Sequence, residues 1–329
     1  MQKFTDPSQA ETRNEVVMET TADEVTDLNT FLDLDDQAVA HHVSAHSTAC
    51  WAVAVGGTRR AYLANGGQLN SPAEYPRYMD WVNHQDITLL DHIFRLGART
   101  VIRVMRFPRD RGGTYTSVAA EALTRLISSP SRRELHARYN MSVSVVAHTA
   151  PGECRVPPLV IDHNARSAPP SAAPRRLIYL LRGDWVDAGV EEARMGFSLG
   201  KTLGREPTKR ELITGYYGLD IPPLAVYIGS GRPRTGNLLP PFIRGNEDLY
   251  WSQTPLLMLN GQDWRRIIFD HLWSRRTQGA RGYNLPEGDR RHLVNSVLAE
   301  RGHILGIGRR HKHGFWIADT TPGRRDGWP

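Results

Sequence analysis

The chain has 329 residues, of which 40% are hydrophobic and 23% charged, with 29 Gly, 21 Pro and two Cys. The hydrophobic share is too high for a wholly disordered chain. No apolar run approaches the roughly 18 residues of a membrane-spanning helix, so stable membrane insertion is not expected. Cys50 and Cys154 are too few for a disulfide framework or a cysteine-rich zinc module, and no signal-peptide pattern precedes them, so we expect reduced thiols and a cytoplasmic protein.

The positive charge is unevenly distributed and consists almost entirely of arginine. The net charge is +6, yet residues 1–36 hold ten acids and two bases, which leaves a strongly basic remainder with only four lysines in the whole chain. Clustered loop arginines favour an anionic ligand because the guanidinium group pairs bidentately with phosphate; the alternative is a compositional bias. A basic chain also suggests nucleic acid, but zinc-finger spacing, RNA-binding aromatics and a basic recognition helix are absent, so no nucleic-acid partner is expected.

Strands and helices alternate along most of the chain. Residues 1–25 are acidic and without periodicity, which predicts a disordered tail, and residues 320–329 are expected to form a flexible C-terminal tail. Apolar runs predict strands at 51–55, 100–105, 141–147, 177–181 and 224–228. Helical spacing and caps predict helices at 27–42, 80–96, 115–127, 186–203 and 263–276, and one that begins after the capping box at 208–211.

This alternation, without internal repeats, predicts a single α/β domain around a mostly parallel sheet, spanning residues 26–319. The proline-rich segment 162–176 is interpreted as a surface loop, because the alternation resumes after it. Ligands of such sheets bind beyond the carboxyl ends of the strands. The loops that follow the strands are therefore the places to search for a site.

The first such loop is Gly56-Gly57-Thr58-Arg59-Arg60, directly after the first strand. Its glycines let the backbone approach an anion closely, Thr58 can donate a hydrogen bond, and Arg59 and Arg60 offer charge-assisted ones. The pattern favours a phosphate or diphosphate site; the alternative is a tight turn with two solvated arginines. It is not a Walker loop, because the terminal Gly-Lys-Ser/Thr is absent.

The second loop runs from Gly229 to Asn237 and follows the strand at 224–228. Its polar residues are Ser230, Arg232, Arg234, Thr235 and Asn237. A loop rich in glycine, proline and arginine is a weak signal alone. Two anion-suited loops at the same edge of one sheet strengthen each other.

Residues 55–60 resemble the diphosphate-binding loop of the cis-prenyltransferases, Asp-Gly-Asn-Arg-Arg, and more closely its Asp-Gly-Thr-Arg-Arg form in the tuberculosinol/tuberculosinyl-adenosine synthase branch. Further matches to that branch follow in order at 31–34, 110–112 with Tyr115, 207–211, 215–218, 228–232, 249–251, 265–267 with 270–271, 306–308 and 313–316. The resemblance covers about residues 28–319, and its ordered spacing is more specific than any single motif. The chain is identified on this basis as a member of the branch.

The resemblance implies a cis-prenyltransferase-fold enzyme of the undecaprenyl diphosphate synthase type that acts as a terpene synthase, with residues 26–319 as the catalytic domain. It implies a prenyl diphosphate held by Gly56, Gly57, Thr58, Arg59 and Arg60, with Arg232, Arg234 and Asn237 from the second loop. It further implies Mg²⁺ as cofactor and a homodimer, with 263–276 as a candidate interface. Tyr78 falls where the branch has a tyrosine implicated in the capture step, so it is a candidate catalytic residue together with Arg59 and Arg60; the alternative is an aromatic residue packed at a helix start.

The sequence departs from the family at Gly56, where family members have a metal-binding Asp. Three explanations are open. Another acid could hold Mg²⁺: Asp248, which falls where chain-elongating relatives have a metal-binding Glu and is our candidate catalytic and metal-binding acid, or Asp80 or Asp86. Alternatively, diphosphate oxygens and water hold the metal while Arg59 and Arg60 compensate. The third explanation is a site that binds prenyl diphosphate without catalysis.

The second diphosphate site of the elongating enzymes is incomplete in this sequence. Their segment Arg-Thr-Gly-Gly-Glu-x-Arg-x-Ser has Gly229 and Gly236 in place of its first Arg and its Ser, whereas Arg234 is retained. Ionisation of a single substrate is therefore favoured over chain elongation, and the resemblance implies that this substrate is an allylic C20 prenyl diphosphate.

Three other patterns favour structural interpretations. His311-Lys312-His313 lacks metal-site spacing, His271 lies on the apolar side of its helix, and Asp184 to Asp187 lies where a helix needs a cap.

Overall fold

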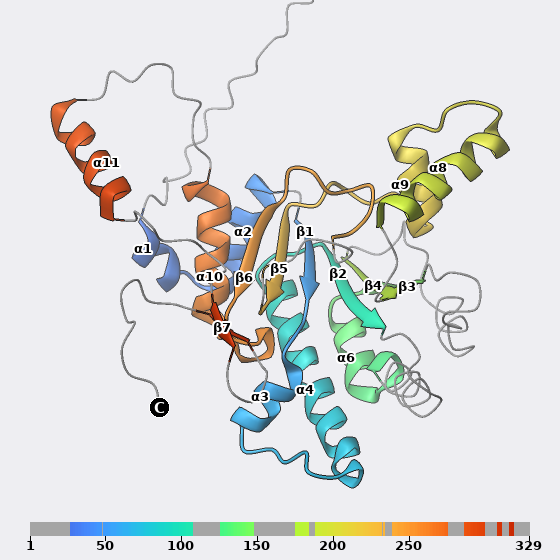
Figure 1. Ribbon diagram of the computed structural model, residues 1–329, viewed down its shortest axis with the longest axis horizontal. Helices are drawn as coiled ribbons and strands as arrows, with labels where there is room; N and C mark the ends of the chain where they lie inside the picture. The colour runs from blue at the N-terminus through green and yellow to red at the C-terminus, as the bar shows by residue number, and fades with distance from the viewer. Residues whose placement is uncertain are drawn as a thin grey trace, which may run out of the picture.

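Six parallel strands form one sheet at the centre of the computed structural model (Figure 1). The structure describes residues 27–47, 49–107, 126–147, 175–183, 188–231, 233, 239–275, 286–299, 308–310 and 316–318. Both predicted tails, most of the predicted helix at 115–127 and most of the predicted loop at 162–176 lie outside these residues.

The sheet has the strand order β3-β4-β2-β1-β5-β6, and every neighbouring pair is parallel. Its strands are β1 Cys50–Ala54, β2 Thr100–Phe107, β3 Met141–Ala147, β4 Arg175–Gly183, β5 Val226–Ser230 and β6 Asp248–Ser252. The predicted α/β class is therefore confirmed. Two boundaries matter for the site: β5 runs to Ser230, two residues beyond the predicted end, and β6 is an edge strand that the sequence analysis did not predict.

Helices cover both faces of the sheet. They are α1 Leu28–Asp33, α2 Asp36–His46, α3 Thr58–Ala64, α4 Tyr75–Arg95, α6 Pro130–Arg138, α8 Ala188–Leu203, α9 Lys209–Tyr217, α10 Gly261–Phe269 and α11 Glu287–Ala299. Short helical turns lie at Pro72–Glu74, Leu256–Met258 and Asp270–Ser274, and β7 Gly308–Arg310 pairs with β8 Trp316–Ala318 in an antiparallel hairpin.

The alternation of side chains along the strands divides the core into two clusters. Trp51 and Val53 of β1 pack with α2, α4 and α10, whereas Ala52 and Ala54 pack with α9 on the opposite face. Strands that are buried on both faces are expected in a parallel sheet covered by helices. Burial also raises the pKa of the Cys50 thiol to about 12, so this thiol stays protonated and unreactive.

Three predicted helices differ from the structure at their ends. The helix predicted at 27–42 is in fact two, because Asp35 caps α2 by accepting a hydrogen bond from Ala38 N at 2.8 Å and Leu34 is extended. The helix predicted at 80–96 begins at Tyr75, since Pro76 is tolerated in a first turn. The helix predicted at 263–276 begins at Gly261 with Asn260 as its cap, and continues after Phe269 as a π-helical turn.

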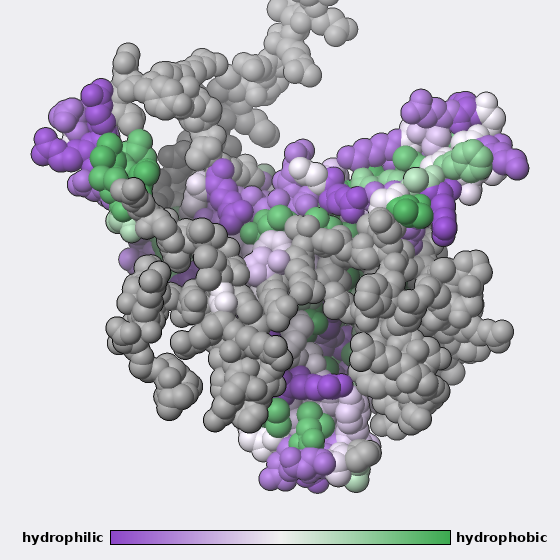
Figure 2. All heavy atoms as spheres, viewed as in Figure 1, coloured by the Kyte–Doolittle hydropathy of each residue, from purple (hydrophilic) through white to green (hydrophobic). Residues whose placement is uncertain are grey.

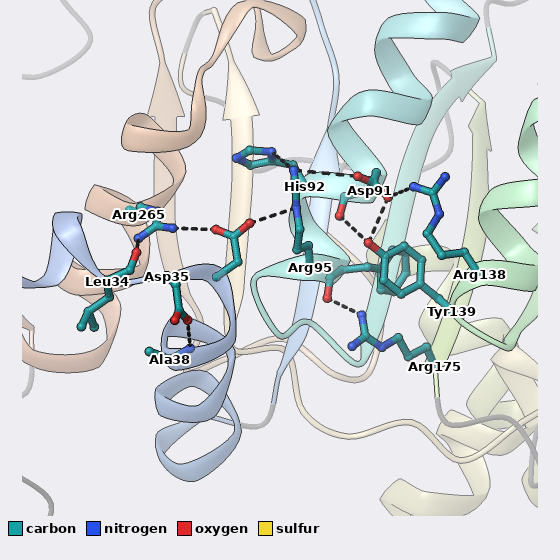
Figure 3. A network of polar contacts seen from close by, with 12 residues as sticks. Leu34, Asp35, Ala38, Asp91, His92, Arg95, Arg138, Tyr139, Arg175 and Arg265 are labelled. Carbon is teal, nitrogen blue, oxygen red and sulfur yellow. Dashed lines mark hydrogen bonds and ion pairs between the residues drawn. The ribbon is translucent and has the colours of Figure 1, made fainter.

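A network of ion pairs joins the helices near the amino ends of the strands (Figure 3). Asp36 accepts from Arg265 at 2.6 Å and pairs with Arg95 at 3.1 Å, which links α2, α10 and α4. Asp91 of α4 accepts from Arg138 of α6 at 2.7 Å. Ion pairs therefore hold the helices together at this edge of the sheet.

Helices α8 and α11 extend away from the sheet on opposite sides of the view in Figure 1. Both expose apolar side chains, visible in green on α11 in Figure 2: Phe197 on α8, and Leu293, Val294, Val297 and Leu298 on α11. Among the described residues, no helix is both long and apolar enough to cross a membrane.

Candidate diphosphate site

The two predicted anion loops meet where β1 and β5 end. These strands are parallel neighbours with Ala54 in register with Gly229, so their carboxyl ends lie at the same edge of the sheet. The hydroxyl of Ser230 accepts a hydrogen bond from Gly56 N at 3.0 Å and donates one to Gly56 O at 3.0 Å. The structure therefore brings together two segments that are about 170 residues apart in the sequence.

Arg60 lies against the glycines of both loops. Gly57 has φ 72°, a left-handed conformation that favours glycine, and it directly precedes α3. A Cβ atom on Gly57 would lie 3.0 Å from Arg60 Nη2, and one on Gly231 would lie 3.6 Å from the same nitrogen. The guanidinium group of Arg60 thus lies between the two loops and close to the backbone of each.

Tyr78 reaches this site from α4. Its hydroxyl lies 2.5 Å from Thr58 Oγ1, and its ring packs edge-on against the rings of Tyr62 and Tyr75 at centroid distances of 5.3 and 5.5 Å. The side chain is buried, with 6% exposure. The structural and functional interpretations of Tyr78 are therefore compatible, because the packed ring delivers the hydroxyl to the loop.

Tyr75 contacts a candidate site residue, and sequence reasoning missed it. Arg59 Nη2 donates a hydrogen bond to the Tyr75 hydroxyl at 3.0 Å. The signal was available, because Tyr75 and Tyr78 are three residues apart and share one side of a helix that begins at Tyr75. The boundary predicted at residue 80 concealed it.

Gly231 is the first residue of the second loop after the end of β5, and it has φ 82°. Its N–H donates a hydrogen bond to Ser252 O at 2.9 Å, which links the loop to β6. Arg232, Arg234 and Asn237 lie outside the described residues. Their part in binding diphosphate stays a prediction.

Asp248 lies away from this site, at the first residue of β6 and in register with Val226 at the start of β5. Four strand residues, about 13 Å, separate that level of the sheet from Ser230. Its carboxylate is bound by His271 Nδ1 at 2.6 Å and by Arg275 Nη1 at 3.5 Å. The structure thus does not place the expected catalytic and metal-binding acid with the two loops.

His271 in turn contacts Ser47 Oγ through Nε2 at 3.0 Å, which completes a hydroxyl–imidazole–carboxylate chain. The order is that of a serine hydrolase, which also needs backbone N–H groups free to bind an oxyanion. Here the N–H of Ser47 donates to Val43 O, and that of Ala49 donates to the Ser47 hydroxyl itself. We interpret this series of three side chains as a structural link between α2, β6 and the turn after α10, which agrees with the structural interpretation of His271.

Asp86, another of the alternative acids, is buried inside the protein and bound by two arginines. It accepts from Arg103 at 2.8 Å and from Arg132 at 2.6 Å, while Arg132 also donates to the Tyr179 hydroxyl at 2.6 Å. Burial by itself raises the pKa of the Asp86 carboxyl, but Arg103 and then Arg132 lower that pKa by more, so Asp86 is an ionised core residue. It is not available at the sheet edge.

Of the acids named from the sequence, this edge offers only Asp80, which is exposed on α4 two residues after Tyr78, and one carboxylate by itself does not make a protein-held Mg²⁺ site. Position 56 has no carboxylate, and Asp86 and Asp248 are bound elsewhere. Within the described ranges, no three His, Cys, Asp or Glu side chains are grouped so that they could hold a metal ion. What this edge presents instead is guanidinium groups, hydroxyls and close-approaching backbone, which suit an anion.

Comparisons with known proteins agree with this fold and motif order. The structure superposes on lavandulyl diphosphate synthase from Lavandula x intermedia, in complex with dimethylallyl diphosphate, with a TM-score of 0.50 and 12% identity over 70% of this chain and 96% of the other. No family model matches. The chain has the cis-prenyltransferase fold.

Its relatives in sequence belong to one branch of that class. It is 27% identical over 299 residues to tuberculosinyl adenosine transferase of Mycobacterium tuberculosis, covering 88% of this chain and 97% of the relative. It is also 31% identical over 120 residues to (+)-kolavelool synthase of Herpetosiphon aurantiacus, covering 35% and 38% of the two chains. The resemblance to the tuberculosinol/tuberculosinyl-adenosine synthase branch is confirmed.

Proposed function

We propose that the chain is a terpene synthase that ionises an allylic C20 prenyl diphosphate, either linear or bicyclic. The C–O bond breaks, its electron pair leaves with the diphosphate, and the allylic cation is captured by water or another nucleophile or loses a proton. One observation carries this proposal: two glycine-rich loops meet at the carboxyl edge of the sheet, with Arg60 between them. This is where an α/β sheet binds its ligand.

In this proposal the loops stabilise the negative charge that develops on the leaving diphosphate. The Thr58 hydroxyl and the guanidinium groups of Arg59 and Arg60 bind its oxygens, and Gly56 and Gly57 let the backbone approach closely. Arg232, Arg234 and Asn237 complete the site from the second loop. Such preorganised groups commonly contribute the largest share of catalysis in reactions that create an anion.

Tyr78 is proposed to direct the capture of the cation. Its hydroxyl is hydrogen-bonded to Thr58, so it lies beside the loop that holds the leaving group. The names of the two relatives describe transfer to adenosine and synthesis of kolavelool, which supports a nucleoside or water as the capturing nucleophile.

Mg²⁺ is proposed to enter with the substrate, held by diphosphate oxygens and water and not by a carboxylate of the described residues. Arg59 and Arg60 then neutralise the charge that the family's Asp-bound metal would share. A homodimer and a catalytic domain over residues 26–319 are part of the same proposal.

The alternative is a non-catalytic subunit that binds prenyl diphosphate, which Gly56 favours. Chain elongation is a further alternative, disfavoured by the glycines at 229 and 236.

Incubation of the full chain with geranylgeranyl diphosphate and with bicyclic diterpenyl diphosphates, with and without Mg²⁺, separates these functions. A synthase releases inorganic diphosphate and an organic-soluble terpene. Binding without either product supports the non-catalytic subunit, and product formation that requires isopentenyl diphosphate supports elongation.

A further inference from the structure

A single hydroxyl holds both backbone polar groups of Gly56. Ser230 Oγ accepts from the N–H and donates to the C=O of the same residue, each at 3.0 Å. A hydroxyl can do both at once, because it has one proton and two lone pairs. Ser230 is the last residue of β5, so this contact fastens the first loop to the neighbouring strand end.

The same hydroxyl lies close to the position that the Cβ atom of a side chain at 56 would take. A Cβ atom on Gly56 would lie 3.0 Å from Ser230 Oγ and 3.5 Å from Ser230 O. Gly56, in contrast to Gly57, does not have the left-handed conformation that requires glycine. A side chain at 56 would therefore meet the Ser230 hydroxyl in a tight contact, while the backbone conformation itself does not require glycine there.

The contact also influences the next residues of both loops. Gly56 directly precedes the left-handed Gly57, which sets the start of α3 and hence the directions of Thr58 and Arg60. Ser230 directly precedes Gly231, whose backbone lies beside the Arg60 guanidinium group. Loss of the hydroxyl would loosen the two loops together.

We propose that Ser230 is a positioning residue of the diphosphate site, which holds the first loop in its anion-binding conformation through its two hydrogen bonds to the Gly56 backbone. This inference rests on the proposed function.

The test is a double-mutant cycle on the full chain, with inorganic pyrophosphate as the probe in calorimetric titrations. Ser230→Ala leaves two backbone groups without their partner, and Gly56→Ala pushes a methyl group against the hydroxyl. Each change is expected to weaken pyrophosphate binding about tenfold. In Gly56→Ala/Ser230→Ala the methyl group at 56 no longer meets the hydroxyl, so its own effect is relieved and binding is expected to be about tenfold weaker and not a hundredfold.

Two further variants separate positioning from general stability. Ser230→Thr keeps the hydroxyl and is expected to retain the wild-type affinity for pyrophosphate and the wild-type KM for prenyl diphosphate. Ser252 is in register with Ser230 on the neighbouring strand, and its hydroxyl makes no side-chain hydrogen bond among the described residues. The Ser252→Ala variant is therefore expected to bind pyrophosphate as the wild type does. Melting temperatures of all variants are expected to stay within a few degrees of one another.

This inference is overturned if Ser230→Ala binds pyrophosphate with wild-type affinity, or if the double mutant loses affinity by the product of the two single effects. In either case a wild type that turns over prenyl diphosphate leaves the proposed function intact. A wild type that neither binds pyrophosphate nor turns over any prenyl diphosphate overturns both.

Discussion

Arginine side chains have different partners at the two ends of the strands. At the amino edge, Arg95 and Arg265 share Asp36 and Arg138 pairs with Asp91 (Figure 3), while Arg275 pairs with Asp270 at 2.6 Å. At the carboxyl edge, Arg60 lies over two glycines, and in the described part of the chain no carboxylate lies within ion-pair distance of it.

The same type of side chain therefore has two kinds of surroundings in one sheet. Where a carboxylate is the partner, arginine holds helices together and the charge is neutralised within the protein. Where glycine backbone lies against it, as at Arg60, no carboxylate of the described residues neutralises the charge, and in the proposed function that charge binds the diphosphate. The comparison predicts that changes at the amino edge alter stability, and that changes at the carboxyl edge alter affinity and turnover.

The largest expected effect lies between the two edges, at Asp86. Asp86→Asn leaves Arg103 and Arg132 buried without their counter-charge, and the free energy of unfolding is expected to fall by about 3–5 kcal/mol. Chemical denaturation measures this loss. Asp91→Asn, which breaks partly exposed pairs, is the matched control and is expected to cost less than about 1 kcal/mol. Equal losses in both variants would contradict the buried network.

The same residue makes stability depend on pH in the acid range. The folded-state pKa of Asp86 lies below its ordinary value of 3.8, so the unfolded chain binds the proton more readily. The contribution of Asp86 is complete above about pH 4 and is lost as the pH falls through the folded-state pKa. Unfolding measured between pH 2 and 5 is expected to be less steeply pH-dependent in Asp86→Asn, and parallel curves would exclude this contribution.

Arg60→Ala tests the carboxyl edge directly. Removing one preorganised charge from a leaving-group site is expected to lower kcat/KM about a hundredfold, a loss of about 2.7 kcal/mol, with little change in stability. Arg210→Ala, on α9 and paired with Asp220 at an exposed position, is the control that leaves turnover unchanged. Equal activity in the two variants would remove Arg60 from the site.

Asp248 provides the corresponding test at the amino edge. Asp248→Asn weakens the contact with His271 and is expected to lower the free energy of unfolding by about 1–2 kcal/mol. The Kd for pyrophosphate is expected to match that of wild type. Loss of pyrophosphate binding with an unchanged free energy of unfolding would show that Asp248 takes part in the diphosphate site.

Tyr75→Phe is expected to have the smallest effect. The Arg59 side chain loses one exposed hydrogen bond, so KM is expected to rise a few-fold while kcat is retained. Tyr78→Phe is the comparison variant, and there the ratio of hydroxylated to deprotonated product is expected to change. Initial rates and product analysis by gas chromatography measure both.

Local patterns predicted the elements that depend on local interactions. The capping box at Thr208 is present, with reciprocal hydrogen bonds to Glu211, and the Gly57 turn precedes a helix as expected. Boundaries failed where tertiary contacts decide them: α4 begins at Tyr75, where Tyr78 packs against Tyr62 and binds Thr58. β6 was missed because a short edge strand forms only by pairing with β5.

The amino-acid sequence by itself determined the α/β alternation, the glycine and arginine composition of the first loop, and the branch of enzymes to which the motif order points. These depend on periodicity and on motif order, which are properties of a linear chain. The tertiary structure alone decided which distant groups meet. It joined Ser230 to Gly56 and Tyr75 to Arg59, and it took Asp86 into the core and Asp248 to the far edge, because parallel strands place their ends in space by register and not by sequence distance.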